Sequence, residues 1–211
     1  MKIGILGSGD VGKALAKAFS SEGHEVMIAT RKPDSEKATA LSDLNVKVGN
    51  FTETAKFCEL AVLCTLWTGT EEAISLINPN NLVDKIVIDV TNPLDFSAGM
   101  PPKLLLGKDN SGGEQIQKWL PKSKVVKAFN TVGNEHMYKP SFGTQTPTMF
   151  FCGNDTGAKE VVKTILLQFG WEPLDIGDIT GARELEVMCI LWVKIGSQTG
   201  NWNNAFKVLT K

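Results

Sequence analysis

Residues 2–19 read KIGILGSGDVGKALAKAF, and this stretch decides how the rest of the chain folds. An apolar strand over 2–6 runs into three glycines spaced as G-x-G-x-x-G. A helix over 13–20 and a second apolar strand, EVMIA at 25–29, follow at once. A strand before such a loop, and a helix and strand after it, form the context that a dinucleotide-binding fingerprint requires. We therefore interpret residues 7–12 as a nucleotide-binding loop.

Each glycine of this loop has a predicted physical role. Gly7 permits a tight turn off the strand, Gly9 leaves room for a pyrophosphate to approach the backbone, and Gly12 lets the helix pack close to the sheet. The helix that follows directs its free N–H groups toward the phosphates. The residues predicted to bind the cofactor here are Gly7, Ser8, Gly9, Asp10, Val11 and Gly12.

The end of the second strand indicates which cofactor is bound. An NAD site places an acid there to bond the ribose 2′-hydroxyl, but this strand ends in Thr30, Arg31 and Lys32. A hydroxyl followed by two cations suits a 2′-phosphate, because a guanidinium can form paired hydrogen bonds with phosphate oxygens. We therefore predict NADP. Asp34, beyond Pro33, is interpreted as the cap of a following helix.

Composition limits the classes of protein to consider. The chain has 211 residues, 42% hydrophobic and 21% charged, with a net charge of −1 and a pI near 6.2. Such a chain is expected to be a packed globular protein, without a nucleic-acid or membrane partner. The apolar run at the N-terminus is too short for a signal peptide. Two histidines far apart give no metal-ligand spacing. Four cysteines within apolar stretches predict buried free thiols in a reducing cytoplasm: Cys58, Cys64, Cys152 and Cys189.

Strands alternate with helices along the chain. Strands are predicted over residues 2–6, 25–29, 45–48, 60–65, 85–90, 124–129, 147–152 and 171–176. Helices are predicted over 13–20, 34–44, 52–58, 70–77, 111–120 and 155–169, with 181–211 mainly helical. Residues 95–111 are expected to form a long surface excursion. The alternation predicts an α/β fold with a doubly wound, mostly parallel sheet of the Rossmann NADP-binding type. Residues 1–180 would bind NADP, and 181–211 would pack on that domain or on a dimer partner.

Five segments resemble one family in sequence and order. They are residues 7–12, GHEV at 23–26, Thr30-Arg31, TNPL at 91–94 and KAFNT at 127–131. Together they are similar to the NADP-dependent coenzyme F420 oxidoreductase family. The resemblance implies hydride transfer between NADPH and a flavin-like ring, either the deazaflavin coenzyme F420 or a flavin. Relatives of this fold also reduce ferric ions, so the resemblance specifies the NADP site more closely than the acceptor.

The resemblance also implies further site residues. Carried over to this chain, Thr65, Leu66 and Trp67 would lie near the nicotinamide, and the facing wall would consist of Asn92, Pro93, Ala128 and Asn130. Trp67 departs from the more aliphatic run expected of the family. Hydride transfer between two stacked rings needs geometry and exclusion of water, because the cofactors carry the reactivity. No catalytic side chain and no metal ion are therefore expected.

Two other functions remain open on the sequence. A reductase of a small carbonyl or imine compound would need a proton donor, for which Lys127, Lys194 and Asn130 are the candidates. Lys127 can equally be a snorkelling residue of an edge strand, and Lys194 a solvated helix residue. A sensor that binds NADPH without turnover is the third possibility.

The last helix carries a wide apolar stripe: Leu185, Met188, Leu191, Trp192 and Ile195. A stripe of this width is typical of a core-facing helix or of an interface between subunits. We expect a homodimer that acts on a small redox substrate.

Overall fold

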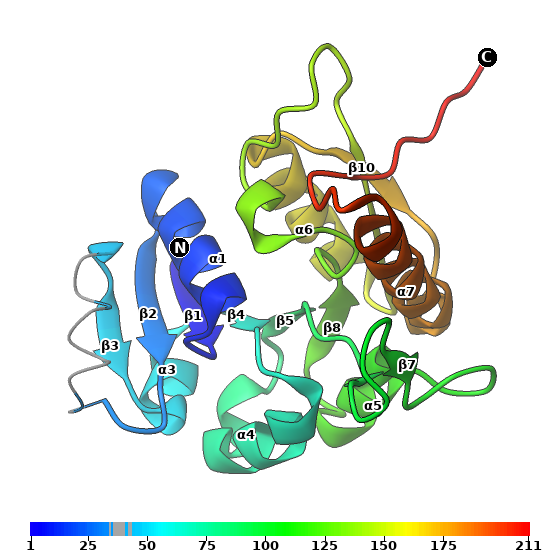
Figure 1. The fold of residues 1–211 in the computed structure, drawn as a ribbon. Coiled ribbons are helices and arrows are strands. Elements are labelled where there is room, and N and C mark those ends of the chain that lie inside the picture. Colours follow the sequence, from blue (N-terminus) through cyan, green and yellow to red (C-terminus); the bar gives the residue numbers. More distant parts are fainter. Residues whose placement is uncertain (34, 36–40, 42–43) are drawn as a thin grey trace.

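The computed structural model describes residues 1–33, 35, 41 and 44–211. Its centre is an eight-stranded sheet with helices on both faces (Figure 1). In spatial order the strands are β3 (Lys47–Gly49), β2 (Glu25–Ala29), β1 (Lys2–Leu6), β4 (Leu60–Leu63), β5 (Ile86–Asp89), β8 (Lys124–Lys127), β9 (Thr148–Gly153) and β10 (Glu172–Asp175). All neighbours pair in parallel except β8 and β9, which are antiparallel. The predicted doubly wound, mostly parallel sheet is confirmed.

Alternating side chains of the strands supply two separate hydrophobic layers. Ile3 and Ile5 of β1 face a cluster that includes residues of α1 (Asp10–Ser21) and α6 (Thr156–Gln168). Leu6 faces the opposite cluster, which includes residues of α3 (Phe51–Phe57), α4 (Thr70–Ile77) and α5 (Gly112–Trp119). This period of two places one residue set on each face of a sheet that is buried on both sides.

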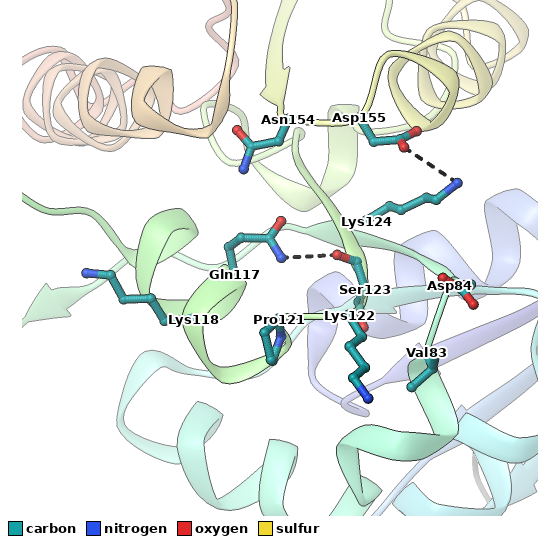
Figure 2. A pocket seen from close by; sticks show the side chains of 10 residues that line it. All are labelled: Val83, Asp84, Gln117, Lys118, Pro121, Lys122, Ser123, Lys124, Asn154 and Asp155. Carbon is teal, nitrogen blue, oxygen red and sulfur yellow. Dashed lines mark hydrogen bonds and ion pairs between the residues drawn. The ribbon is translucent and has the colours of Figure 1, made fainter.

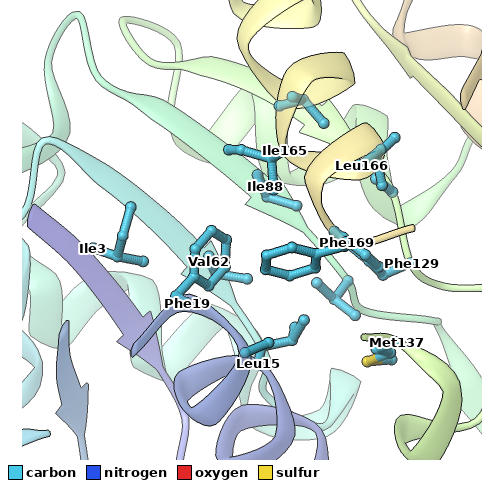
Figure 3. Packing of buried hydrophobic residues seen from close by; sticks show 14 of the residues in the cluster. Ile3, Leu15, Phe19, Val62, Ile88, Phe129, Met137, Ile165, Leu166 and Phe169 are labelled. Atoms are coloured by element: carbon cyan, nitrogen blue, oxygen red, sulfur yellow. The ribbon is translucent and has the colours of Figure 1, made fainter. Parts of the chain in front are cut away.

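Aromatic rings join α1 to the second half of the chain (Figure 3). Phe19 of α1 lies 4.9 Å from Phe169, and Phe129 lies 5.9 Å from Phe169, measured between ring centroids. All three side chains are fully buried. Rings at these separations add to the energy of burial, so the two halves of the sheet share one core on this face.

The strand order predicts a ligand-binding crevice at the carboxyl edge. The chain builds outward from β1 through β2 to β3, then returns to start β4 on the other side of β1. The loops after β1 and β4 therefore leave the sheet in opposite directions. In open α/β sheets, ligands bind at this reversal, outside the carboxyl ends of the strands.

The C-terminal segment differs from its predicted form. Residues 181–211 were expected to be mainly helical, but α7 covers only Ala182–Thr199. Gly200 ends this helix in the left-handed conformation, at φ +69°. The following residues are not helical and run back along the sheet, where the Thr148 N–H donates to the Phe206 carbonyl at 2.8 Å. Trp202 packs directly on the backbone of α7 at Gly196.

Two other predicted segments need comment. The excursion at 95–111 holds a short antiparallel pair, β6 (Leu94–Asp95) and β7 (Lys103–Leu104), beside α7. The helix predicted over 34–44 lies almost entirely outside the described residues, as does its predicted cap Asp34. Among the described residues, no helix is long and apolar enough to cross a membrane, and no group of acids, histidines and cysteines could hold a metal ion.

Candidate functional site

Two glycines of the loop after β1 are required by the protein itself. Gly7 has φ +129°, and a Cβ built on it would lie 2.8 Å from the Cys64 carbonyl oxygen. A Cβ on Gly12 would lie 2.0 Å from the Gly7 carbonyl oxygen. Gly7 therefore supplies the predicted turn. Gly12 lets α1 lie against the Gly7 carbonyl and close to Ile5 of β1, in line with the predicted packing of this helix on the sheet.

Gly9 is different, because neither space nor backbone conformation requires a glycine there. Its φ is −72°, which any residue adopts, and a Cβ built on it would meet no atom of the described residues within 4 Å. The residue is exposed at the mouth of the loop, between half-buried Ser8 and exposed Asp10. A missing side chain with no internal reason fits a loop against which a ligand must lie closely.

The start of α1 also leaves a feature that the protein itself does not use. No side chain caps this helix, although a helix leaves its first N–H groups without internal partners. By contrast, α3, α5 and α6 are capped by Asn50, Ser111 and Asp155 respectively. The remaining described α-helices, α4 and α7, continue from short 3-10 turns. The N–H groups and positive dipole end of α1 are thus left to face the crevice, where an anion would satisfy them.

The predicted 2′-phosphate residues follow β2 at the same edge of the sheet. Thr30 is half-buried, and its N–H is held by the Gly49 carbonyl at 3.0 Å. Arg31 and Lys32 are exposed. Because β2 pairs in parallel with β1, with Ala29 beside Leu6, these residues start at the same level as the glycine loop.

The segment after β4 forms a second side of the crevice. Thr65 is held by a hydrogen bond to the Thr70 hydroxyl at 2.8 Å. Leu66 is 81% exposed, an unusual state for a leucine that follows a buried strand. Trp67 stacks on Trp119 of α5, with centroids 5.7 Å apart and planes at 27°. Trp67 is therefore fixed against α5.

The segments after β5 and β8 are joined by an amide pair. The Asn92 side chain donates to the Asn130 carbonyl, and Asn130 Nδ2 donates to Asn92 Oδ1 and to the Leu185 carbonyl of α7, each at 2.9 Å. Asn130 is only 4% exposed, yet its Oδ1 has no partner among the described residues. Phe129, which precedes it, is held at φ +64°. Strain of this kind clusters at functional sites, so this turn fits a site that presents an acceptor to a ligand.

A buried charge cluster lies directly beneath these two segments. The Lys127 ammonium donates to Asp89 Oδ2 at 2.8 Å, to the Thr91 carbonyl at 2.7 Å and to Glu186 Oε1 at 3.0 Å. Its three N–H donors are therefore all used, and Lys127 is completely buried. Burial by itself would lower the pKa of Lys127, but the attraction and hydrogen bonds of Asp89 and Glu186 outweigh it and raise the pKa.

These contacts correct two predictions for Lys127. It is not a snorkelling residue of an edge strand, because β8 lies between β5 and β9. It is also unsuited to donate a proton, because its ammonium is enclosed by two carboxylates. Pro93 and Ala128 are buried beside the same cluster, whereas Lys194 is exposed on α7 as a solvated residue.

Glu186 was not among the predicted site residues. It reaches from α7 to the start of α5, where its carboxylate accepts from the Gly112 N–H at 2.9 Å and the Gly113 N–H at 3.1 Å. The two glycines let α7 approach, since a Cβ on Gly112 would lie 2.9 Å from Glu186 Oε1. The available signal was an acid inside an apolar helix stripe, which is rarely buried unless paired.

A surface cavity of about 850 Å³ lies elsewhere (Figure 2). Lys124, which begins β8, and Asp155, which follows β9, lie in its lining and form an ion pair at 3.5 Å. Gln117 donates to the Ser123 carbonyl at 3.0 Å. This cavity opens at the amino end of β8, the edge opposite the glycine loop, and belongs to no part of the candidate site.

Comparison with known proteins agrees with this fold. A family model described as NADP oxidoreductase coenzyme F420-dependent matches residues 2–93. A crystal structure from Arthrobacter sp. FB24, assigned as an F420-dependent NADP-reductase, is 37% identical, covers 100% of both chains and has a TM-score of 0.93. This chain belongs to the coenzyme F420-dependent NADP oxidoreductase family.

Two curated relatives of this chain differ in how much of their own length it covers. The F420-dependent NADP reductase of Methanocaldococcus jannaschii is 28% identical over 92% of this chain and 91% of its own. The metalloreductase STEAP3 of Rattus norvegicus is 29% identical over 89% of this chain. The chain spans only about a third of that metalloreductase, 36% of its length.

Proposed function

We propose that this chain binds NADPH at the carboxyl edge of its sheet and transfers a hydride to a flavin-like acceptor, coenzyme F420 or a flavin. The observation that carries the proposal is Gly9, a glycine in the binding loop that the protein itself does not require. The uncapped start of α1 gives independent support, because the pyrophosphate of a dinucleotide supplies the missing anion.

The residues present fit NADPH. The first turn of α1 would hold the pyrophosphate, and Thr30 with Arg31 would hold the 2′-phosphate. Asn130, oriented by Asn92 and Leu185, offers a buried acceptor oxygen to an N–H donor of the ligand. We assign this binding role to residues 1–180. NADPH, when bound, supplies the hydride, and exposed Leu66 would exclude water from the place where the acceptor docks.

Reduction of a carbonyl or imine compound has less support. Lys127 is enclosed by Asp89 and Glu186, and Lys194 is exposed on the outer side of α7. Asn130, the third candidate, carries an amide that does not release a proton at neutral pH. A ring that accepts a hydride directly does not need a proton donor from the protein, and this difference favours the flavin-like acceptor.

The test is anaerobic oxidation of NADPH by the purified chain, with the deazaflavin coenzyme, FMN and a ferric chelate as parallel acceptors. Rapid bleaching of the deazaflavin or FMN is the expected result. Turnover with the ferric chelate alone would reassign the acceptor to the metal class of the STEAP3 relative. Tight NADPH binding without turnover of any acceptor would overturn the enzymatic proposal in favour of a sensor.

We also propose a homodimer in a reducing cytoplasm. The four cysteines are free, with Cys64 half-buried and the other three buried, which suits a reducing compartment. On α7, Val187 and Leu191 remain 57% and 47% exposed beside residues that face the core. Such apolar residues favour contact with a second copy. A single monomeric mass in light scattering across a wide concentration range would contradict the dimer.

A further inference from the structure

The buried cluster of Asp89, Lys127 and Glu186 connects four separate parts of the site. Asp89 ends β5, Lys127 ends β8, and Glu186 comes from α7. Through Glu186 the cluster also reaches the N–H groups that begin α5. All three charged side chains are buried, Lys127 completely. The cluster therefore lies directly next to residues 91–93 and 128–130, the segments predicted to face the nicotinamide.

Its charges balance only when all parts are in place. Two carboxylates and one ammonium leave a net negative charge in a buried position, which is costly unless it is compensated. The positive end of α5 supplies the compensation, because Gly112 and Gly113 both donate to Glu186. Asp89 Oδ1 is satisfied in turn by the Thr91 N–H at 2.8 Å and its hydroxyl at 2.7 Å. The hydrogen bonds of each charged group are therefore satisfied in this one arrangement, which fixes the positions of the three side chains.

Two hydrogen bonds link the cluster directly to the segments 91–93 and 128–130. Lys127 donates to the Thr91 carbonyl, one residue before Asn92. Asn130 donates to the carbonyl of Leu185, one residue before Glu186 on α7. A displacement of Glu186 must therefore move Leu185, and with it the orientation of the Asn92–Asn130 pair.

We propose that the Asp89–Lys127–Glu186 cluster positions the segments 91–93 and 128–130 against the nicotinamide half of NADPH, with Glu186 as the positioning residue that docks α7. The proposal rests on the proposed function in one respect, that NADPH is the ligand. In this proposal, two sets of residues have separate effects on the same ligand. The glycine loop and Arg31 determine affinity, and the cluster determines the orientation of the reacting ring.

The test compares Glu186→Gln with Glu114→Gln. Glu114 pairs with Arg183, also between α5 and α7, at 2.6 Å and outside the cluster, so its variant controls for general loosening of the two helices. Glu186→Gln is expected to keep the NADPH Kd within about threefold, because the hydrogen bonds and ion pairs of the cluster, among the described residues, do not involve the glycine loop or Arg31, and because misalignment of Asn130 affects one hydrogen bond of the ligand. It is expected to lower the anisotropy of the bound nicotinamide emission and to reduce kcat by about 10- to 100-fold, the usual effect of an ångström-scale misplacement. Glu114→Gln is expected to match the wild type in all three.

Several outcomes would overturn the proposal. Unchanged emission anisotropy and kcat in Glu186→Gln, with only a lower melting temperature, would make the cluster merely structural. Equal losses in both variants would assign the effect to helix loosening. If Glu186→Gln does not fold, the paired change Asp89→Asn with Lys127→Met removes one charge of each sign and must show the same anisotropy loss. Failure of the wild type itself to bind NADPH would overturn the proposed function, and this proposal with it.

Discussion

Gly9→Ala is the change that most cleanly separates ligand binding from folding. An added methyl at this position meets no atom of the described residues within 4 Å, and the backbone at φ −72° accepts alanine. The folded protein should therefore lose only the preference of a helix N-cap for glycine over alanine, about 0.5–1 kcal/mol.

The loss in NADPH binding should be much larger. The methyl would stand where the pyrophosphate must approach the N–H groups of α1. Hydrogen bonds to a charged group contribute about 1.5–3 kcal/mol each, so losing two weakens binding by about 3–6 kcal/mol. This corresponds to roughly a 150- to 25,000-fold increase in the NADPH Kd.

The assay is titration calorimetry with NADPH, alongside urea unfolding of the same samples. Gly157→Ala is the matched control, because Gly157 is an exposed glycine in the first turn of α6, which begins at the opposite edge of the sheet. Binding by Gly9→Ala within a few-fold of the wild type, or an equal loss in the control, would refute the reasoning.

Three further predictions concern charged residues. Arg31→Ala should weaken NADP by about 1.5–3 kcal/mol in calorimetry and leave NAD unchanged; equal loss for both would remove Arg31 from the 2′-phosphate. Lys127→Met should lower the free energy of unfolding in urea by about 3–5 kcal/mol, because two carboxylates remain buried without their cation; a loss below about 1 kcal/mol would contradict the buried cluster. The hydrogen bond from Arg183 lowers the pKa of Glu114 against the opposing effect of burial. The pair therefore stabilises the fold above the unfolded pKa near 4.3 and loses that effect as pH falls through the folded pKa. Glu114→Gln should accordingly destabilise by about 0.5–1.5 kcal/mol at pH 7 and progressively less below pH 4; a pH-independent difference in unfolding experiments would count against it.

The sequence was sufficient for features fixed by neighbouring residues. The loop at Gly7–Gly12 and the strand and helix that flank it follow from local spacing, because turns are made within a few residues. The left-handed end of α7 at Gly200 was equally local, yet the apolar residues beyond it favoured a longer helix. Packing of Trp202 on Gly196 accounts for those apolar residues without a helix.

The buried cluster was beyond sequence reasoning for a physical reason. Lys127 meets Asp89, 38 residues away, and Glu186 meets Gly112, 74 residues away. Each charge sits in an apolar run of its own, and nothing local shows that the three runs converge. Only the sheet order, which brings β5 beside β8, and the docking of α7 on α5 bring them together.

The central claim is that the carboxyl edge of this sheet holds a dinucleotide by its phosphates and selects NADPH by the third one. Calorimetric titration of the wild-type chain with NADPH and with NADH tests it most directly. We predict that NADPH binds tighter by about 1.5–3 kcal/mol, roughly 10- to 150-fold in Kd, the contribution expected of the Arg31 guanidinium on a 2′-phosphate. Equal affinity for the two, or binding of neither, would contradict the account.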